Sequence, residues 1–162
     1  MDLRGLAALS SRILSLLSDA ENQGQDGLEL FAVSRICEKR GEDIRARTLH
    51  EKSITSFLPT ETARLARRSL ARLAKRQGDF NLACELWTGA LGNSRHCYEA
   101  YEQLAIYYER TARDPKQARQ IVHQTLDGLR GAIQIGDIAP GPYGEIRARF
   151  DRRLRRLERK TF

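Results

Sequence analysis

The sequence predicts an all-α protein whose helices recur in pairs, and two spacings carry this prediction. Leu70 is echoed by Leu104, 34 residues later, which is the period of helix–turn–helix units stacked on one another. Ala71, Ala83 and Ala90 are separated by 12 and 7 residues. One small residue then lies on a first helix and two on a second, where their low bulk lets the helices approach closely. We therefore expect a short α-solenoid.

The same small-residue template occurs twice more. Its positions are held by Ser34, Ala46 and Ser53 upstream and by Ala105, Ala118 and Thr125 downstream. The downstream spacing is 13 and 7 instead of 12 and 7. The added residue falls at Arg113-Asp114-Pro115, where Asp is a good N-cap and Pro fits the first turn of a helix. About three helix pairs result.

The repeats are expected over residues 28–131. Their units are about 28–58, 60–93 and 95–131. The paired helices are predicted at 28–40, 43–56, 60–77, 79–92, 95–112 and 115–130, with breaks at Gly41, Leu58-Pro59 and Gly78. Glycine and proline are the residues that most often interrupt a helix.

Further segments flank the repeats. Residues 1–18 carry Leu and Ile at helical spacing and predict an amphipathic N-terminal helix, followed by a polar linker at 19–27. Residues 132–162 predict a connection and a final basic helix that caps the stack. The connection is expected to be irregular because of Gly131–Gly136 and Pro140-Gly141-Pro142.

The stretch Lys75–Ala83, followed by Trp87 and Ala90-Leu91, closely resembles the tetratricopeptide repeat. Gly78 stands at the expected offset, whereas Arg67 occupies a place where that repeat usually has an aromatic residue. The resemblance implies a right-handed α-solenoid with a concave groove that binds protein partners, and with Trp87 inside the fold.

A second resemblance covers Asp2–Leu9 and Glu99–Arg110. Asp2–Leu9 is similar to the final helix of the ribonuclease H-like exonuclease domain in a family of bacterial proteins, and Glu99–Arg110, with Arg45–Leu49 and Leu86-Trp87, resembles the helical tail that follows this domain. This resemblance implies a fragment or product without the nuclease core, in which Asp2 would match the last metal-binding aspartate; Asp2 as a helix N-cap is the alternative. A single carboxylate cannot hold the metal pair that such hydrolysis uses, so we expect no enzyme activity from this chain.

Basic residues predict a binding surface. The chain has 28 Lys and Arg against 21 Asp and Glu, a net charge of +7. Arg64, Arg68, Arg72 and Arg76 follow one another at intervals of four, which puts their guanidinium groups on one helix face. In a tetratricopeptide stack this face lines the groove. The predicted groove residues are Arg35, Lys39, Arg68, Arg72, Arg76, Glu102 and Glu109, basic at one end and acidic at the other.

A second basic cluster lies near the C-terminus. Its predicted patch is Arg149, Arg152, Arg153 and Arg156. Such a helix can attract a polyanion. The alternative interpretation is a solvated outer face that keeps a leucine-rich helix in solution.

Other chemistry finds little support in the residue pattern. His50, His96 and His123 are scattered, and the spacing of the cysteines matches no zinc motif, so we expect no metal and no cofactor. Three cysteines without a C-x-x-C pair favour a reducing, cytoplasmic location. The sequence contains no apolar run of about 18 residues, so we expect no membrane-spanning helix.

Two functions fit these patterns. The leading hypothesis is a protein-interaction scaffold whose groove holds an acidic or mixed-charge peptide. The alternative is a nucleic-acid-binding accessory module for a ribonuclease H-like exonuclease. An uncovered edge of a three-unit stack could also pair with a second copy to form a homodimer.

Overall fold

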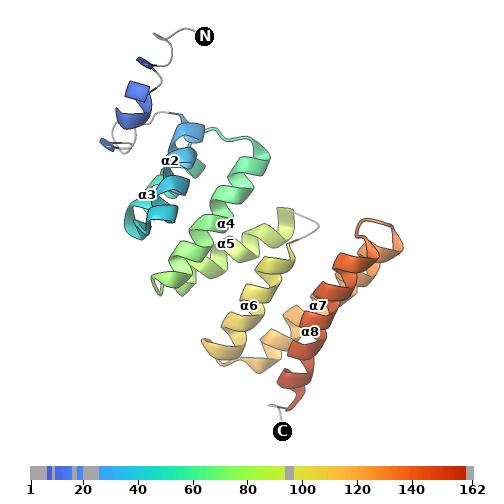
Figure 1. Cartoon of the computed structure of the whole chain (residues 1–162). Helices are drawn as coiled ribbons and strands as arrows, with labels where there is room; N and C mark the ends of the chain where they lie inside the picture. The colour runs from blue at the N-terminus through green and yellow to red at the C-terminus, as the bar shows by residue number, and fades with distance from the viewer. Residues whose placement is uncertain (1–6, 9, 16–17, 20–25, 94–96, 160–162) are drawn as a thin grey trace. The chain divides into compact units, whose positions relative to one another are not determined.

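The computed structural model describes residues 7–8, 10–15, 18–19, 26–93 and 97–159. Within these residues the regular structure is entirely helical, with no strand, which confirms the all-α fold class (Figure 1). The helices are α2 (Gly27–Arg40), α3 (Asp43–Thr55), α4 (Thr60–Arg76), α5 (Phe80–Asn93), α6 (Tyr98–Arg110), α7 (Pro115–Gln134) and α8 (Pro140–Arg159). In the described part of the chain, no helix combines the length and the apolar character that a membrane span requires.

The chain forms two compact units, Met1–Leu86 and Trp87–Phe162, with the boundary inside α5. In the first unit, α3 packs against both α2 and α4, and α2 also touches α4. In the second unit, α7 packs against both α6 and α8, and α6 also touches α8. Each unit thus contains a hairpin of helices and a third helix that packs mainly against the second helix of that hairpin (Figure 1).

The core of the first unit follows the small-residue template. One cluster of buried apolar side chains in this core consists of Leu30, Val33, Cys37, Ala46, Leu49 and Leu73. The template residues Ser34, Ala46 and Ser53 have no exposed surface, and Ala71 and Ala83 are equally inaccessible, at 1% and 0%. Short side chains at these sites let the helix backbones approach.

The core of the second unit is formed by larger side chains around the same template. Its fully buried members are Leu104, Val122, Leu129, Phe150 and Leu157. The template residues Ala105, Ala118 and Thr125 are buried among them, and the Thr125 hydroxyl donates to the Ile121 carbonyl at 2.8 Å. The remaining template residue, Ala90, is half-buried, whereas Trp87 is buried as expected.

Glycines end three of the helices in the same way. Gly41, Gly78 and Gly136 have φ values of 76°, 81° and 75°, in the left-handed region that glycine adopts without steric cost. After each of them, a backbone N–H returns to the helix: Glu42 to Cys37, Asp79 to Ala74 and Asp137 to Ala132, at 2.8–3.0 Å. This arrangement is the Schellman motif, which satisfies the last carbonyl groups of a helix. The breaks predicted at Gly41 and Gly78 are confirmed.

The turn at Arg113-Asp114-Pro115 agrees with its prediction. Asp114 caps α7, its carboxylate accepting from the Gln117 N–H at 2.9 Å, and Pro115 is the first helical residue. Arg113 is the one described residue other than glycine with a positive φ, 54°. The added residue of the third template therefore adopts a conformation that is costly for a side chain with a Cβ.

The connection after the repeats is shorter than the sequence predicts. Residues 131–134 continue α7, and Pro140, Gly141 and Pro142 form the first turn of α8. Leu129 and Ala132 are buried and keep the helical period of the apolar face, which outweighs the low helix propensity of the glycines. Proline has no N–H to lose in a first turn, so it begins α8 without disruption.

The predicted N-terminal helix and linker lie partly outside the described residues. Residues 7–8, 10–15 and 18–19 are helical. Arg12 pairs with Glu29 of α2 at 2.6 Å. Asp26, at the end of the predicted linker, caps α2 by accepting from the Leu28 N–H at 3.0 Å.

Candidate interaction surfaces

The first surface is the arginine-bearing face of α4. Ala66, Leu70, Leu73 and Ala74 turn one side of this helix into the core. Because the arginines lie at other positions of the helical period, their side chains reach solvent. Arg64, Arg67, Arg68, Arg72 and Arg76 are all exposed.

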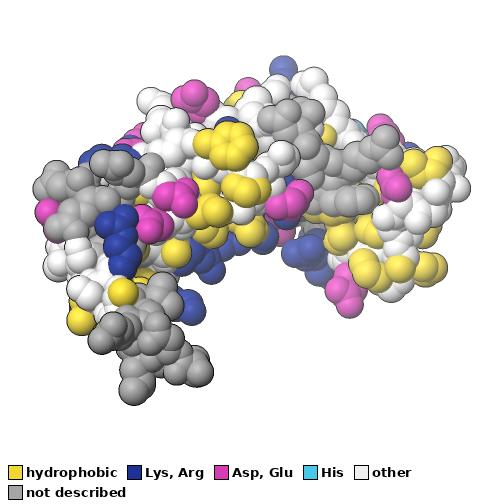
Figure 2. All heavy atoms as spheres, turned by 90° about the horizontal axis from the view of Figure 1, so that it is seen from above, with side chains coloured by type: hydrophobic (Ala, Val, Ile, Leu, Met, Phe, Trp, Pro, Cys, Tyr) yellow, Lys and Arg dark blue, Asp and Glu magenta, His cyan; other side chains and the backbone are white. Residues whose placement is uncertain are grey.

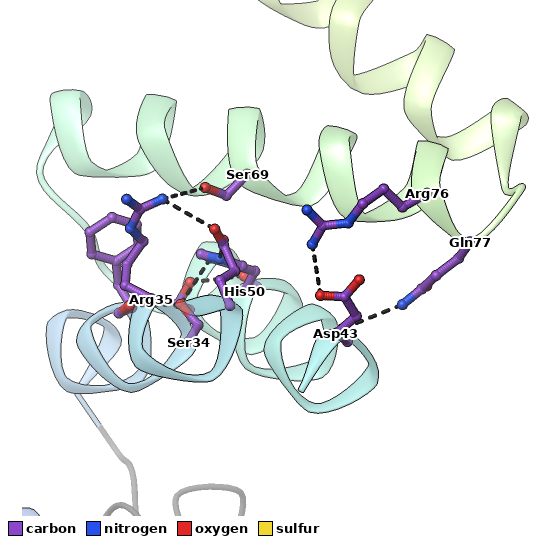
Figure 3. A network of polar contacts seen from close by, with 10 residues as sticks. Ser34, Arg35, Asp43, His50, Ser69, Arg76 and Gln77 are labelled. Atoms are coloured by element: carbon purple, nitrogen blue, oxygen red, sulfur yellow. Dashed lines mark hydrogen bonds and ion pairs between the residues drawn. The ribbon is translucent and has the colours of Figure 1, made fainter. Parts of the chain in front are cut away.

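The two ends of this arginine row are held by carboxylates. Arg64 pairs with Glu61 of the same helix at 2.9 Å, and Arg76 pairs with Asp43 of α3 at 2.7 Å. Gln77 also donates to the Asp43 carbonyl, at 3.3 Å. Figure 3 shows Arg76 and Gln77 converging on Asp43. Arg76, a predicted groove residue, therefore also joins α4 to α3.

Helix α2 brings two more cations beside this face. Arg35 donates from Nη1 to the Ser69 hydroxyl of α4 at 3.1 Å and to Glu38 at 3.2 Å (Figure 3). Lys39 follows Arg35 by one helical turn and is exposed. Ser69 precedes Arg72 by three residues, so the Arg35 guanidinium lies next to the row on α4. We call Arg35, Lys39, Arg68 and Arg72 the basic surface of the first unit.

A buried polar chain supports Arg35 from within the unit. His50 of α3 has no exposed side-chain surface; its Nδ1 lies 3.0 Å from the Ser34 hydroxyl and its Nε2 contacts the Glu38 carboxylate. Burial lowers the pKa of His50, although Glu38 acts in the opposite direction. A neutral ring that carries its proton on Nε2 donates to Glu38, while the Ser34 hydroxyl beside Nδ1 donates to the Phe31 carbonyl at 2.6 Å. The other carboxylate oxygen of Glu38 accepts a hydrogen bond from the Arg35 guanidinium. Contacts thus run continuously from Ser34 to Ser69 across three helices.

A second polar cluster closes the end of this unit. Arg47 of α3 donates to Asp79 at 2.8 Å, to the Gln77 side chain at 3.0 Å and to Glu51 at 2.9 Å. The hydrogen bond from Arg47, together with one from the Leu82 N–H, lowers the pKa of Asp79. These contacts join α3 to the turn that follows α4.

The predicted groove residues of the second unit contact the predicted C-terminal patch. Glu109 of α6 accepts two parallel bonds from Arg156 of α8, at 2.8 and 2.6 Å, and a third from Arg153 at 3.0 Å. Glu102 pairs with Arg149 at 3.3 Å and with Arg153 at 3.9 Å. Residues assigned by sequence to two separate sites therefore form one ion-pair cluster.

This cluster is largely removed from water. The side chain of Glu109 is 2% exposed and that of Arg153 is 12% exposed. Burial, with the nearby charge of Arg156, lowers the pKa of Arg153. The pKa of Arg156 is raised by the hydrogen bonds that Arg156 makes to Glu109. Two-point contact between a guanidinium and a carboxylate is the strongest form of such a pair. We call Glu102 and Glu109 the acidic surface of α6.

The other face of α8 retains exposed arginines. Arg152, Arg155 and Arg159 reach solvent along it. Arg147 lies 3.5 Å from Asp151, and its guanidinium is 5.9 Å from the centre of the Tyr143 ring. Only Arg152 of the four predicted patch residues is thus outside the cluster with α6.

Neither surface contains a metal site. Among the described residues, no three His, Cys, Asp or Glu side chains are placed to hold an ion. None of the three cysteines forms a disulfide; Cys37 is buried, and Cys84 and Cys97 are half-buried. Figure 2 shows basic, acidic and hydrophobic side chains interspersed on the face it presents.

Sequence reasoning missed the role of Glu38 and the partners of Glu109. A signal was present, because Glu38 follows the template residue Ser34 by four positions and Glu109 follows Ala105 by four. In both units a glutamate therefore lies one turn after the small residue of the first helix, at the contact with the neighbouring helices.

Comparison with known proteins adds no identification: no protein-family model, curated protein or solved structure matches this chain.

Proposed function

We propose that this chain is a non-catalytic helical scaffold that holds an acidic segment of a partner protein on the basic surface of the first unit. The observation that carries the proposal is the placement of Arg68 and Arg72 on the exposed face of α4 with Arg35 of α2 beside them. Guanidinium groups in such a row suit carboxylates, each of which can accept two parallel bonds. The stacking of helix pairs as in a tetratricopeptide array belongs to the same proposal, and the buried template residues support it.

The arrangement favours a protein ligand because the charges are few and separated along a helix. Arg68 and Arg72 are one turn apart, so an acidic helix or extended segment with carboxylates at a similar interval can meet both. The Ser69 hydroxyl of α4 and the Glu38 carboxylate of α2 hold the Arg35 side chain in place before the ligand binds. A cation that is already positioned loses less conformational entropy when it binds.

The test uses a fluorescently labelled glutamate-rich peptide and the R68E/R72E variant. We expect fluorescence anisotropy to show binding to the wild-type chain and at least about tenfold weaker binding to the variant, which corresponds to about 1.4 kcal/mol. Both substitutions are on exposed positions, so circular dichroism should show unchanged helicity.

The matched control is R110E/R130E, which changes the net charge equally at exposed positions of the second unit. It should bind the peptide within about twofold of the wild-type chain, because the proposed contacts are made by arginines of α2 and α4, and exposed charges that make no contact with the peptide are screened by salt. Equal weakening in both variants would show that only net charge matters. Unchanged binding to R68E/R72E would refute the assignment.

Nucleic-acid binding is a second candidate, favoured by the exposed arginines Arg152, Arg155 and Arg159 on α8. Phosphate contacts release counterions, so affinity for an oligonucleotide should fall steeply as salt increases. Single- and double-stranded oligonucleotides should be titrated into the wild-type chain and into the R152Q/R155Q variant. The titrations should be done at about 50 and about 200 mM salt, because phosphate-dependent binding weakens strongly between these two concentrations. No binding at the lower salt removes this candidate.

A further inference from the structure

The acidic surface of α6 and the arginines of α8 match in spacing. Glu102 and Glu109 are seven residues apart, two turns of a helix, on the same face of α6. Arg149, Arg153 and Arg156 lie at i, i+4 and i+7 on α8, also within two turns. Each of these three arginines pairs with at least one of the two carboxylates. The two carboxylates are therefore spaced to pair with guanidinium groups at these positions of an adjacent helix.

Helix α8 is attached to the rest of its unit by few apolar contacts. Of its 20 residues, only Phe150 and Leu157 are buried. The equally long α7 buries Ala118, Ile121, Val122, Thr125, Leu126, Leu129 and Ala132. The connection between the two helices is also largely exposed, with Ile135 at 70%. Opening free energies within a protein are lowest where few apolar contacts are made, so α8 should be displaced more easily than α7.

We propose that the acidic surface of α6 is a recognition site for an arginine-bearing helix, which α8 fills within the same chain and which a partner helix with arginines at i, i+4 and i+7 takes over by displacing α8. The site differs in position and charge from the basic surface of the first unit. The inference therefore does not depend on the proposed function.

The burial of Glu109 makes such a site selective. Its carboxylate is 2% exposed while paired with Arg153 and Arg156. A competing helix that lacks these arginines would leave that carboxylate buried without a counter-charge, which is strongly unfavourable. A helix that has them restores the same ion pairs, so the exchange replaces like with like. Discrimination then comes from the penalty on wrong partners.

Two synthetic helices of equal charge test the proposal. Both carry the sequence of residues 140–159. One retains Arg149, Arg153 and Arg156 and has Gln at 152, 155 and 159; the other retains Arg152, Arg155 and Arg159 and has Gln at 149, 153 and 156. Each is titrated into the full-length R149Q/R153Q/R156Q variant, in which α8 keeps Phe150 and Leu157 but no longer supplies the three guanidinium groups. Circular dichroism checks that the two peptides are equally helical.

The first peptide should bind the variant at least about tenfold more tightly than the second, and a further Glu109→Gln change should remove the difference. Equal affinities, or no binding of either peptide, would overturn the proposal. Because the variant could fail to fold, the same question is put to the wild-type chain by hydrogen exchange. Excess first peptide should speed exchange of the amides in α8 and leave α2 and α3 unchanged, and the second peptide should not; unchanged exchange in α8 would also overturn the proposal.

Discussion

Glu38 and Glu109 occupy equivalent places after a small template residue, yet different helices neutralise them. Glu38 takes its partners from α3 and from its own helix, His50 and Arg35. Glu109 takes its partners from α8, Arg153 and Arg156. In the first unit the acid therefore orders a polar chain that ends at the exposed Arg35. In the second it pairs with arginines on the side of α8 that faces α6, because a carboxylate with this little exposure is strongly unfavourable without a counter-charge.

The burial of His50 predicts how stability depends on pH. Burial holds the pKa of His50 below the ordinary value of 6.5. Below that pH the imidazole of the unfolded chain binds a proton that the folded chain does not yet accept, so the unfolded state gains protons relative to the folded state. The free energy of unfolding should therefore fall as the pH drops through 6.5 and level off once the folded ring is protonated too.

Urea unfolding at several pH values between about 7.5 and about 5.0 measures this dependence, because that range covers about one pH unit or more on each side of the ordinary histidine pKa. His123 is exposed on α7, so H123Q is the control and should keep the wild-type slope. H50Q should be less stable and should show a shallower slope. A slope in H50Q equal to that of the wild-type chain would contradict the role assigned to His50.

Helix ends show how local backbone chemistry shapes each unit. Three helices end in a glycine with positive φ, whereas α6 ends near Arg113, which has a φ of 54°. The Asp114 N–H donates to the Tyr108 carbonyl at 2.8 Å, six residues back, whereas the bonds after Gly41, Gly78 and Gly136 reach five residues back. Arg113 therefore shares the left-handed backbone conformation of these glycines, in a turn with a different hydrogen-bond pattern.

Replacing Arg113 by Gly should stabilise the protein. The change relieves a left-handed conformation that costs about 1–2 kcal/mol, and part of this gain is offset because glycine makes the unfolded chain more flexible. We expect a net gain of about 0.5–1 kcal/mol, or a rise in Tm of about 1–4 °C for a chain of this size. Differential scanning calorimetry measures it.

The reciprocal variant is Gly41→Ala. An added Cβ at Gly41 would meet nothing within 4 Å, so only the backbone conformation, φ of 76°, opposes the change. This variant should lower Tm by a similar amount. A lower Tm for R113G would show that the Arg113 side chain contributes more than its backbone costs.

At the scale of the whole molecule, the net charge of +7 describes the two units poorly. The C-terminal helix is rich in arginine, yet three of its arginines are directed at Glu102 and Glu109. The first unit instead presents exposed cations on α2 and α4. A count of charges along the sequence thus overstates the polyanion-binding capacity of α8 and treats Glu102 and Glu109 as available when they are paired.

Glu109→Gln should destabilise the second unit. It removes the carboxylate that pairs with Arg156 in a partly dehydrated site and leaves Arg153 only its longer contact with Glu102, at 3.9 Å. Breaking one member of a buried pair costs about 3–5 kcal/mol. We expect the lower end, about 3 kcal/mol, since Arg156 is still 43% exposed. Urea unfolding measures the loss, and hydrogen exchange should place it in α6 and α8 while α2 and α3 keep their protection.

The control is Glu145→Gln, which removes the same charge from an exposed position of α8. Its effect should stay within about 0.5 kcal/mol, as for most surface substitutions. Similar destabilisation by both variants would mean that the loss comes from the net charge of the second unit and not from the contact between α6 and α8.

The helix pairs could be predicted because they depend on short-range features of the chain. Small residues such as Ala71 and Ala83 are buried where helices pack closely. Gly41 and Gly78 mark helix ends through their backbone conformation alone. The pairing of Glu109 with Arg153 and Arg156 could not, because it joins residues 44 and 47 positions apart. It depends on the rotation of α8, which Phe150 and Leu157 set by entering the core. The basic surface was predictable for α4, whose arginines recur every fourth residue, but the bond from Arg35 to Ser69 required the packed structure.

The burial of Cys37 gives the first unit a reporter of its own opening. Cys37 lies in the core cluster between α2 and α3, and burial, with a hydrogen bond to Glu42, raises the pKa of its thiol. Only the thiolate reacts readily with alkylating reagents, so the folded chain shields this sulfur by both access and ionisation. The rate of its modification by iodoacetamide therefore follows the separation of two helices in solution, with no engineered label.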